Sequence, residues 1–265
     1  MNDIIQYGVA ESGVVPVRRT PSETSEMVTQ LFLGETVGII AYEGVWARVI
    51  PDFDRYEGWV GTGQIKVLSE SDYHSWMNHP QRKRSPFRCR MARCSVHNYL
   101  QVPAGAWIPM TEDALEWFGD EFSFQSDPIR IVTDNVIETA MGFLGVPYLW
   151  GGRTENGIDC SGFIQTIHML HGITLPRDSR DQYDFGDHKG VHLEEASHGD
   201  IIFFKHPDRQ VNHIGFYLGD GLLLHASGQV RIDRIDPDYA SDATYRFNRL
   251  LSEGIVGIIR PFSDT

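Results

Sequence analysis

The sequence predicts a mixed α+β chain, in which an all-β first part precedes a part with helices first and an antiparallel sheet after. Three observations predict this class. Short apolar runs fill the first seventy residues, apolar residues recur at helical spacing near 136–144 and 160–170, and strand-like runs return from residue 200 onward. We therefore expect domains at 1–70, 71–128 and 129–265.

Regular spacing of short apolar runs makes the first seventy residues typical of a small β-barrel. Turn residues such as Pro21-Ser22 and Glu43-Gly44 separate the runs. The strands expected here are Tyr7–Val9, Val14–Val17, Val28–Leu33, Thr36–Tyr42, Trp46–Ile50 and Gly58–Val60.

Residues 71–128 give a weaker pattern. The basic stretch His79–Arg93 favours a solvated connection over a nucleic-acid arm, because it is short and the whole chain is acidic. Cys89, Cys94 and His97 have loose spacing and no evident fourth ligand, so we expect no metal site. Further apolar runs at Tyr99–Val102 and Trp107–Met110 suggest a second small β domain.

The last part begins with helical patterns. Thr133 or Asp134 is placed to cap a helix with an apolar face at Val136, Ile137, Ala140, Met141 and Leu144. Asp159 is placed to cap a second helix, Cys160 to Leu170, which Gly172 ends. Strands are expected at Asp200–Lys205, Val211–Leu218, Leu222–Ala226, Tyr245–Leu251 and Ile255–Arg260.

Cys160 is the candidate nucleophile. At the first turn of a helix, free backbone N–H groups and the macrodipole favour the thiolate. The plainer interpretation is a small buried hydrophobic side chain, which most free cysteines are. The choice between these two interpretations depends on whether a base lies near.

Two histidines lie inside apolar strands, His213 and His225. If Gly219-Asp220-Gly221 forms a three-residue hairpin loop, Gly215 opposes His225, and His213 shares its face of the sheet. A two-residue loop would put the histidines on opposite faces. Two imidazoles on one face, with a cysteine at a helix start packed against the sheet, would form a nucleophile, a base and an orienting group.

Composition limits the class of protein. The chain has 265 residues, of which 41% are hydrophobic and 22% charged, as in ordinary soluble globular proteins. A net charge of −13 disfavours binding to nucleic acid or anionic lipid. The first residues show no secretory signal pattern and no segment is apolar enough to span a membrane. Three cysteines argue against a disulfide framework, so we expect a reducing compartment, the cytoplasm. We also expect the protein to be a monomer.

Residues 129–265 resemble the NlpC family of papain-like bacterial cell-wall cysteine peptidases. The matching motifs, in the family's order, are Tyr148-x-Trp150-Gly151-Gly152, Asp159-Cys160-Ser161-Gly162-Phe163, Leu175-Pro176-Arg177-Asp178-Ser179, Gly199-Asp200-Ile201-Ile202-Phe203-Phe204, His213-Ile214-Gly215 and His225-Ala226. The first domain resembles a bacterial SH3-like domain through Arg18/Pro21, Gln30/Gly34/Glu35, Trp46/Val49 and Tyr56/Gly58/Trp59/Val60. Residues 71–128 are assigned to a second SH3-like module by position and composition.

The resemblance implies a papain-like catalytic domain behind two SH3-like barrels. It assigns Cys160 as nucleophile, His213 as base and His225 as the orienting residue, with Tyr148 assisting at the oxyanion. It also implies a substrate ammonium held by Asp159, Ser161, Asp178 and Ser179, and it suggests Glu26 and Tyr56 for the part of the first domain that closes the groove. No cofactor is expected.

The combination of domains resembles the γ-D-glutamyl-L-diamino acid endopeptidases, which cut murein peptides with a free N-terminal L-Ala. We therefore expect a murein tripeptide or tetrapeptide substrate and a role in cell-wall peptide recycling. Two alternatives stay open at this point: an amidase or acyltransferase on the same fold, and a non-catalytic wall-binding scaffold.

Overall fold

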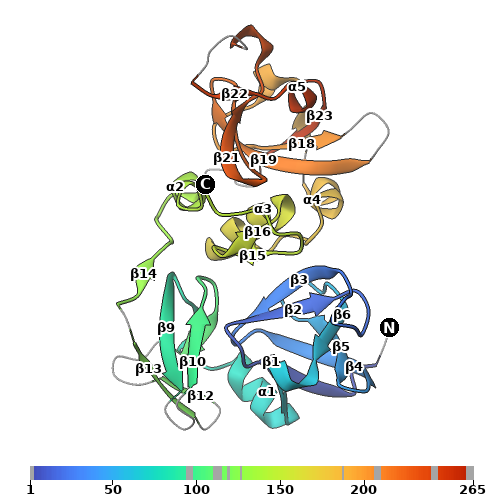
Figure 1. Ribbon diagram of the computed structural model, residues 1–265, viewed down its shortest axis with the longest axis vertical. Coiled ribbons are helices and arrows are strands. Elements are labelled where there is room, and N and C mark those ends of the chain that lie inside the picture. Colours follow the sequence, from blue (N-terminus) through green and yellow to red (C-terminus); the bar gives the residue numbers. More distant parts are fainter. Residues whose placement is uncertain are drawn as a thin grey trace. The chain divides into compact units, whose positions relative to one another are not determined.

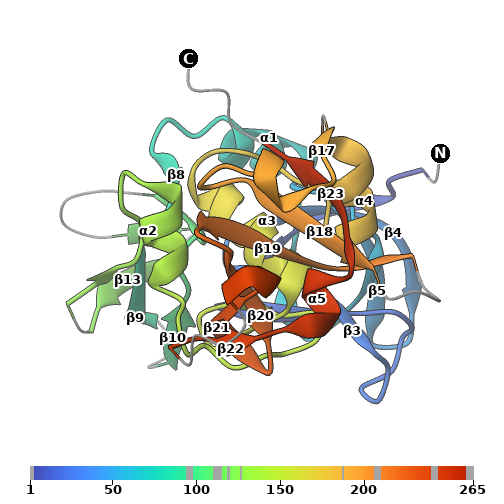
Figure 2. The same ribbon diagram turned by 90° about the horizontal axis from the view of Figure 1, so that it is seen from above.

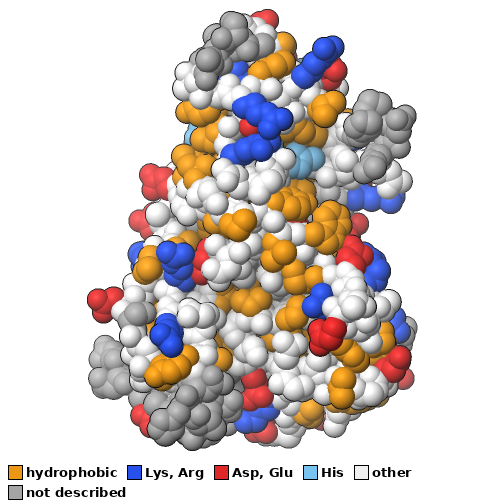
Figure 3. All heavy atoms as spheres, viewed as in Figure 1, with side chains coloured by type: hydrophobic (Ala, Val, Ile, Leu, Met, Phe, Trp, Pro, Cys, Tyr) orange, Lys and Arg blue, Asp and Glu red, His pale blue; other side chains and the backbone are white. Residues whose placement is uncertain are grey.

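The computed structural model describes residues 3–93, 98–109, 115–117, 120–125, 127–186, 188–205, 210–239 and 244–260. The chain forms two compact units, residues 1–132 and 133–265 (Figure 1). None of the described helices is long and apolar enough to cross a bilayer. On the face drawn in Figure 3, side chains of both charge signs are interspersed with hydrophobic ones.

The first unit begins with a seven-stranded antiparallel sheet. Its strand order is β3-β2-β6-β5-β4-β1-β7. The six expected strands are present and a seventh, β7, follows them. The bounds are β1 Gln6–Ala10, β2 Val14–Arg18, β3 Met27–Phe32, β4 Thr36–Glu43, β5 Trp46–Pro51, β6 Gly58–Gly61 and β7 Ile65–Leu68.

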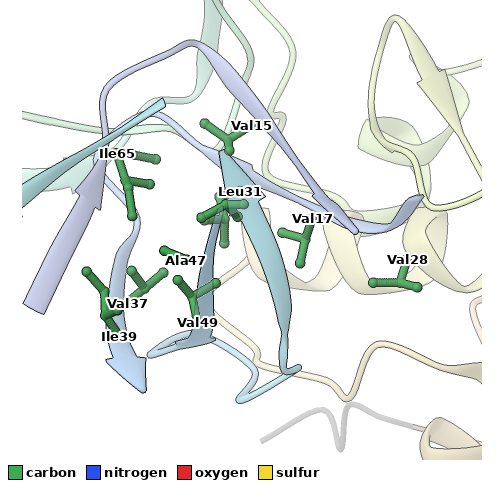
Figure 4. Close-up of a cluster of buried hydrophobic side chains, with 11 residues drawn as sticks. Val15, Val17, Val28, Leu31, Val37, Ile39, Ala47, Val49 and Ile65 are labelled. Carbon is green, nitrogen blue, oxygen red and sulfur yellow. The ribbon is translucent and has the colours of Figure 1, made fainter. Parts of the chain in front are cut away.

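The apolar side chains of these strands form one core (Figure 4). Burial alternates strictly along β5, where Ala47 and Val49 point inward and Arg48 lies between them. This period of two is the pattern of a strand with one face on a core. The core cluster consists of Ala10, Val15, Val17, Val28, Leu31, Val37, Ile39, Ala47, Val49, Val60 and Ile65.

The rest of the first unit is a helix and a second antiparallel sheet. Strands β10, β9, β13 and β12 pair in that order, β14 also pairs with β9, and β8 pairs with β11. The bounds are α1 Glu70–Met77, β8 Arg82–Arg84, β9 Phe87–Arg93, β10 Asn98–Val102, β11 Trp107–Pro109, β12 Leu115–Trp117, β13 Asp120–Phe124 and β14 Ile129–Arg130. The strands expected near 99–102 and 107–110 are confirmed within the described residues.

The basic stretch 79–93 is not a solvated connection, which corrects the expectation. It forms β8 and the whole of β9. The guanidinium of Arg84 lies 4.5 Å from the centroid of the Trp107 ring and pairs with buried Glu35 at 3.2 Å. Arg82 also stacks on Trp107, at 4.0 Å. Aromatic stacking and ion pairing hold these two guanidinium groups against the rest of the unit. A binding arm would instead present its cations to a partner.

The second unit is a seven-stranded sheet with helices packed on it (Figure 2). The strand order is β17-β23-β18-β19-β20-β21-β22, antiparallel except for β21 with β22. The bounds are α2 Val136–Met141, β15 Arg153–Thr154, β16 Gly157–Ile158, α3 Cys160–Leu170, α4 Ser179–Phe185, β17 His188–Gly190, β18 Ile201–Lys205, β19 Val211–Gly219, β20 Leu222–Ser227, β21 Gln229–Arg234, β22 Arg246–Phe247, α5 Arg249–Ser252 and β23 Ile255–Ile259.

Helix α3 begins and ends where the sequence predicts. Asp159 is its N-cap, with Oδ1 accepting from the Gly162 amide at 2.7 Å, and Gly172 beyond its end has a φ of +82°. The helix packs against β19 and β20, and Phe163 meets the edge of Phe216 at 5.6 Å between ring centroids. Burial on nearly every side makes α3 the central helix of the unit.

Two expectations for the ends of this unit are wrong. The cap of α2 is Asn135 in place of Thr133 or Asp134, because its Oδ1 accepts from the amides of Ile137 and Glu138 at 2.8 and 3.0 Å. Residues 245–251 form the short β22 and then α5, where one strand was expected. Asn248 caps α5 through Leu251, which ends the extended run.

Candidate active site

Cys160 is the first residue of α3 and its side chain is buried. The helix is brought close to the preceding loop by a glycine. A Cβ on Gly162 would lie 2.3 Å from the Gly152 carbonyl oxygen, so a side chain at 162 would push the helix away from the loop. The sequence around the cysteine therefore fixes where the sulfur lies.

Asp159 holds this loop and the helix start together. Its carboxylate accepts from the Gly151 amide at 2.7 Å and from both terminal nitrogens of Arg177 at 3.1 and 2.6 Å. Asp159 and Arg177 are both buried, so they form a paired charge inside the unit. The Ser161 hydroxyl belongs to the same network, because it accepts from Arg177 at 2.8 Å.

These contacts give Asp159 and Ser161 a structural role, and their binding of a substrate ammonium stays a prediction. Both oxygens of the carboxylate already accept from strong donors. An ammonium at the same carboxylate would have to share these oxygens with Arg177 and the backbone amides. The geometry makes Asp159, Ser161 and Arg177 the frame that positions Cys160. The sequence motif contained Arg177, but only the ion pair reveals its role.

The environment of Cys160 does not stabilise a resting thiolate. Burial, followed by the nearby Asp159 carboxylate, raises the pKa of Cys160 to about 12, although Arg177 and backbone N–H groups act in the opposite direction. The thiolate expected from the helix position is therefore overridden by desolvation. A nucleophile at this position would need a base to take the thiol proton.

His213 and His225 form a hydrogen-bonded pair. His213 Nε2 lies 2.7 Å from His225 Nδ1, and the two rings stand edge to face. The register of β19 and β20 places Gly215 opposite His225, as expected. A Cβ on Gly215 would lie 2.9 Å from the Cβ of His225, so glycine allows the strands to approach here.

The hairpin that sets this register differs from the expected one. Its loop is Asp220-Gly221, two residues long, because Gly219 pairs with Leu222. A β-bulge between Tyr217 and Gly219 adds one residue to β19 and restores the register. The two histidines therefore share one face through a bulge in the strand.

The pair leaves Nδ1 of His213 available to act on a proton. Burial and the neighbouring His225 lower the pKa of His213 to about 3, so the ring is neutral near pH 7. No hydrogen bond joins Cys160 Sγ to either imidazole among the described residues, and the Cys160–His213 contact stays a prediction. Such contacts often tighten only when substrate binds.

Tyr148 lies half-buried in the loop before the helix. Burial, followed by the charges of Cys160 and Asp159, raises the pKa of Tyr148 well above its usual range. The hydroxyl therefore keeps its proton near neutral pH and is a hydrogen-bond donor in the neighbourhood of Cys160. This property suits an oxyanion, and the assignment itself stays a prediction.

The remaining predicted binding residues are placed as follows. Asp178 is exposed and Ser179 half-buried at the start of α4. In the first unit, Glu26 is exposed and paired with Arg19, and Tyr56 packs against the core of the first sheet. Binding by these four residues stays a prediction.

A cavity of about 290 Å³ adjoins His213. Its wall comes from β18, β19, α5 and β23, with apolar surface from Phe204, Leu251 and Ile255 and polar groups at Lys205, Asn212 and Glu253. The second unit therefore has room for a ligand directly beside the candidate base.

Among the described residues, no three His, Cys, Asp or Glu side chains cluster as metal ligands would. Cys94 and His97, weighed as zinc ligands, lie outside the described residues. Cys89 is buried and not in a disulfide.

Comparisons with known proteins find two domain models that match this chain. The model of the NlpC/P60 family matches residues 145–249, and that of the bacterial dipeptidyl-peptidase SH3 domain matches residues 17–65. A γ-D-glutamyl-L-lysine dipeptidyl-peptidase of Bacillus subtilis is 30% identical over 218 residues, which is 75% of this chain and 71% of the relative. A protein of the same name from Bacillus cereus is 29% identical, over 82% of this chain and 72% of its own.

A solved structure has the same fold. The crystal structure of an NlpC/P60 family protein from Bacillus cereus superposes with a TM-score of 0.79 at 23% identity, covering 96% of this chain and 99% of that one. The fold agrees with the family and domain matches. The chain is therefore a member of the NlpC/P60 family of cysteine hydrolases that act on cell-wall peptidoglycan, with an N-terminal SH3 domain of the bacterial dipeptidyl-peptidase type.

Proposed function

We propose that this protein is an endopeptidase that hydrolyses the bond between γ-D-Glu and the diamino acid of murein peptides, and releases L-Ala-γ-D-Glu. The observation that carries the proposal is the His213–His225 pair at 2.7 Å, which leaves one ring nitrogen of His213 for a proton transfer in the unit that carries Cys160. The names of the two Bacillus relatives support the bond specificity.

The reaction follows from these groups. His213 Nδ1 takes the thiol proton as Cys160 Sγ attacks the γ-carbonyl carbon. The carbonyl oxygen becomes an oxyanion, which the Cys160 backbone N–H and the Tyr148 hydroxyl are suited to receive. His213 then returns the proton to the leaving amine, and a thioester remains on the sulfur. Water, deprotonated by the same imidazole, hydrolyses the thioester and frees the dipeptide.

The cavity beside His213 suits the leaving part of the substrate. A general acid must reach the leaving nitrogen, so the diamino acid has to lie next to this ring. The cavity wall is mostly apolar and carries both a carboxylate, Glu253, and an ammonium, Lys205, which fits an aliphatic chain with charged groups of both signs at its end. Glu253 also pairs with Arg249 at 2.7 Å, so the cavity does not hold an isolated negative charge.

The finer part of the proposal is that the substrate is a released peptide with a free amino end, as in peptide recycling. Asp159, Ser161, Asp178 and Ser179 are our candidates for the L-Ala ammonium, and we test Asp178 because the Asp159 carboxylate already binds Arg177. A charge-assisted hydrogen bond contributes about 1.5–3 kcal/mol, which corresponds to ~10- to ~150-fold in kcat/KM.

The test compares kcat/KM for L-Ala-γ-D-Glu-diaminopimelate, the same tripeptide acetylated on L-Ala, and whole sacculi, with mass analysis of the products. We expect the free tripeptide to be cut at the γ-D-Glu bond ~10- to ~150-fold faster than the acetylated one. Asp178→Asn should abolish most of that preference, whereas Asp181→Asn, an exposed carboxylate on the same helix, should retain it.

Equal rates on the free and acetylated peptides would overturn the amino-end requirement. Efficient release of fragments from sacculi would overturn the recycling role. Transfer or deamidation products without hydrolysis would favour the amidase or acyltransferase alternative.

A further inference from the structure

A buried carboxylate lies behind the imidazole pair. Asp233 in β21 is 1% exposed, and its Oδ2 is 3.2 Å from His225 Nε2. The position follows from the register: β20 and β21 pair Leu223 with Asp233 and His225 with Arg231, so all four side chains belong to one face of the sheet. The predicted site did not include this residue.

The imidazole pair by itself does not determine where its proton lies. His213 Nε2 and His225 Nδ1 share one proton across 2.7 Å. If His213 carries it, His213 Nδ1 is bare and can accept the thiol proton. If His225 carries it, neutral His213 has its own proton on Nδ1 and cannot act as the base.

The Asp233 carboxylate distinguishes these two states. A bare Nε2 on His225 would turn its lone pair toward an anion 3.2 Å away, which is repulsive, whereas an N–H there is attracted. The ring N–H is not aligned for a hydrogen bond, so the attraction is one of charge. With the proton on Nε2, the neutral His225 ring has a bare Nδ1 and accepts from His213.

Two other groups hold the carboxylate in its charged form. Asn248 Nδ2 donates to Oδ2 at 2.8 Å, and Arg231 lies 3.1 Å from each oxygen. Burial alone would raise the pKa of Asp233, but the contacts from His225, Asn248 and Arg231 outweigh it and hold that pKa well below its usual range. Because Arg231 balances the charge, Asp233 orients His225 without requiring a second proton on it.

We propose that Asp233 is a positioning residue, which sets the tautomer of His225 and through it keeps His213 Nδ1 free of a proton. The inference rests on the proposed function of His213 as the base. It adds Asp233 to the row of groups that begins with His213 and His225.

The experiment reads the tautomers directly in the full chain, without substrate. The protein is labelled with ¹⁵N-histidine, and long-range ¹H–¹⁵N spectra are assigned with His213→Gln and His225→Gln. We expect both rings to carry their proton on Nε2. Asp233→Asn should move His225 toward the Nδ1–H form, and should lower kcat on the tripeptide by ~10- to ~100-fold with KM changed less than twofold.

Asp200→Asn is the matched control. Asp200 is also 1% exposed in the same unit, but its carboxylate is held by Arg260 at 2.8 Å. We expect both tautomers to stay as in the unsubstituted protein and kcat to change less than twofold.

An unsubstituted protein with His225 as imidazolium, or with its proton on Nδ1, would overturn the inference even if Asp233→Asn failed to fold. Unchanged tautomers in a folded Asp233→Asn protein would do the same. Because the spectra need no substrate, a protein that shows the expected tautomers but does not cut the peptide would contradict the proposed function alone.

Discussion

The two seven-stranded sheets of this protein differ in what they bury. The first sheet encloses a cluster made entirely of Val, Leu, Ile and Ala (Figure 4). Outside this cluster the first unit buries few polar groups, among them Glu35 and Gln30, whereas the second unit buries a larger set of charged ones, among them Arg153, Asp159, Arg177, His225 and Asp233. An apolar core contributes stability without directional requirements, whereas a buried charge is tolerated only with its partners in place. The second unit therefore depends more on paired charges than the first.

The largest expected effect is a loss of activity, which should follow from substitutions in the second unit and not from those in the core of the first sheet. Cys160→Ala should abolish turnover, and His213→Ala should reduce kcat/KM by at least ~10³-fold, since nucleophile and base act as a unit. His225→Ala should be milder, because it removes only the orienting partner. The measurement is peptide hydrolysis, with circular dichroism to show that each variant is folded.

Ile39→Ala in the first core is the control for this prediction. It should destabilise the protein by about 2–5 kcal/mol and leave kcat at a temperature below its melting point within a fewfold of the original. An active His213→Ala protein would refute the assigned mechanism.

The second prediction compares stability directly. Asp159→Ala leaves the buried Arg177 without its carboxylate and should cost about 3–5 kcal/mol in free energy of unfolding. Ile39→Val deletes one methyl group from the apolar core and should cost about 0.5–1.5 kcal/mol. Urea unfolding of both variants measures the difference. A cost for Asp159→Ala no larger than that for Ile39→Val would show that the ion pair is not a structural frame.

The third prediction uses a buried histidine beneath the second sheet. His168 is fully buried, stacks on Phe216 at 5.5 Å, and has Nδ1 2.7 Å from the Ile164 carbonyl oxygen. Burial lowers the pKa of His168 to about 4, below the value near 6.5 expected in the unfolded chain. The unfolded state therefore binds more protons between these pH values, so stability is present above pH ~6.5 and is lost as pH falls toward ~4.

The loss from His168 should be at most on the order of 3 kcal/mol. It is measured as the free energy of unfolding at pH 7 and pH 4.5. His168→Phe keeps an aromatic ring against Phe216 but cannot titrate, so it should show a smaller loss over the same interval. Equal losses in the two proteins would show that His168 does not contribute.

Local sequence patterns predicted what depends on neighbours along the chain. The strands of the first sheet, the start of α3 at Cys160 and its end at Leu170 follow from alternation, helical spacing and a capping side chain. Prediction failed at residues 245–251, because the Asn248 cap competes with an extended pattern and only the folded chain decides between them. The Asn135 cap was missed for a similar reason, since three successive polar residues could each have served.

The sequence by itself also determined the candidate chemistry, since a cysteine after a capping aspartate and two histidines in apolar strands are visible as residue types at set spacings. Only the tertiary structure decided the partners. It paired Asp159 with Arg177, raised the pKa of Cys160 through burial, restored the imidazole register with a bulge, and placed Asp233 behind His225. Charge pairing and desolvation depend on distances between segments far apart in the chain, and spacing along a sequence does not contain those distances.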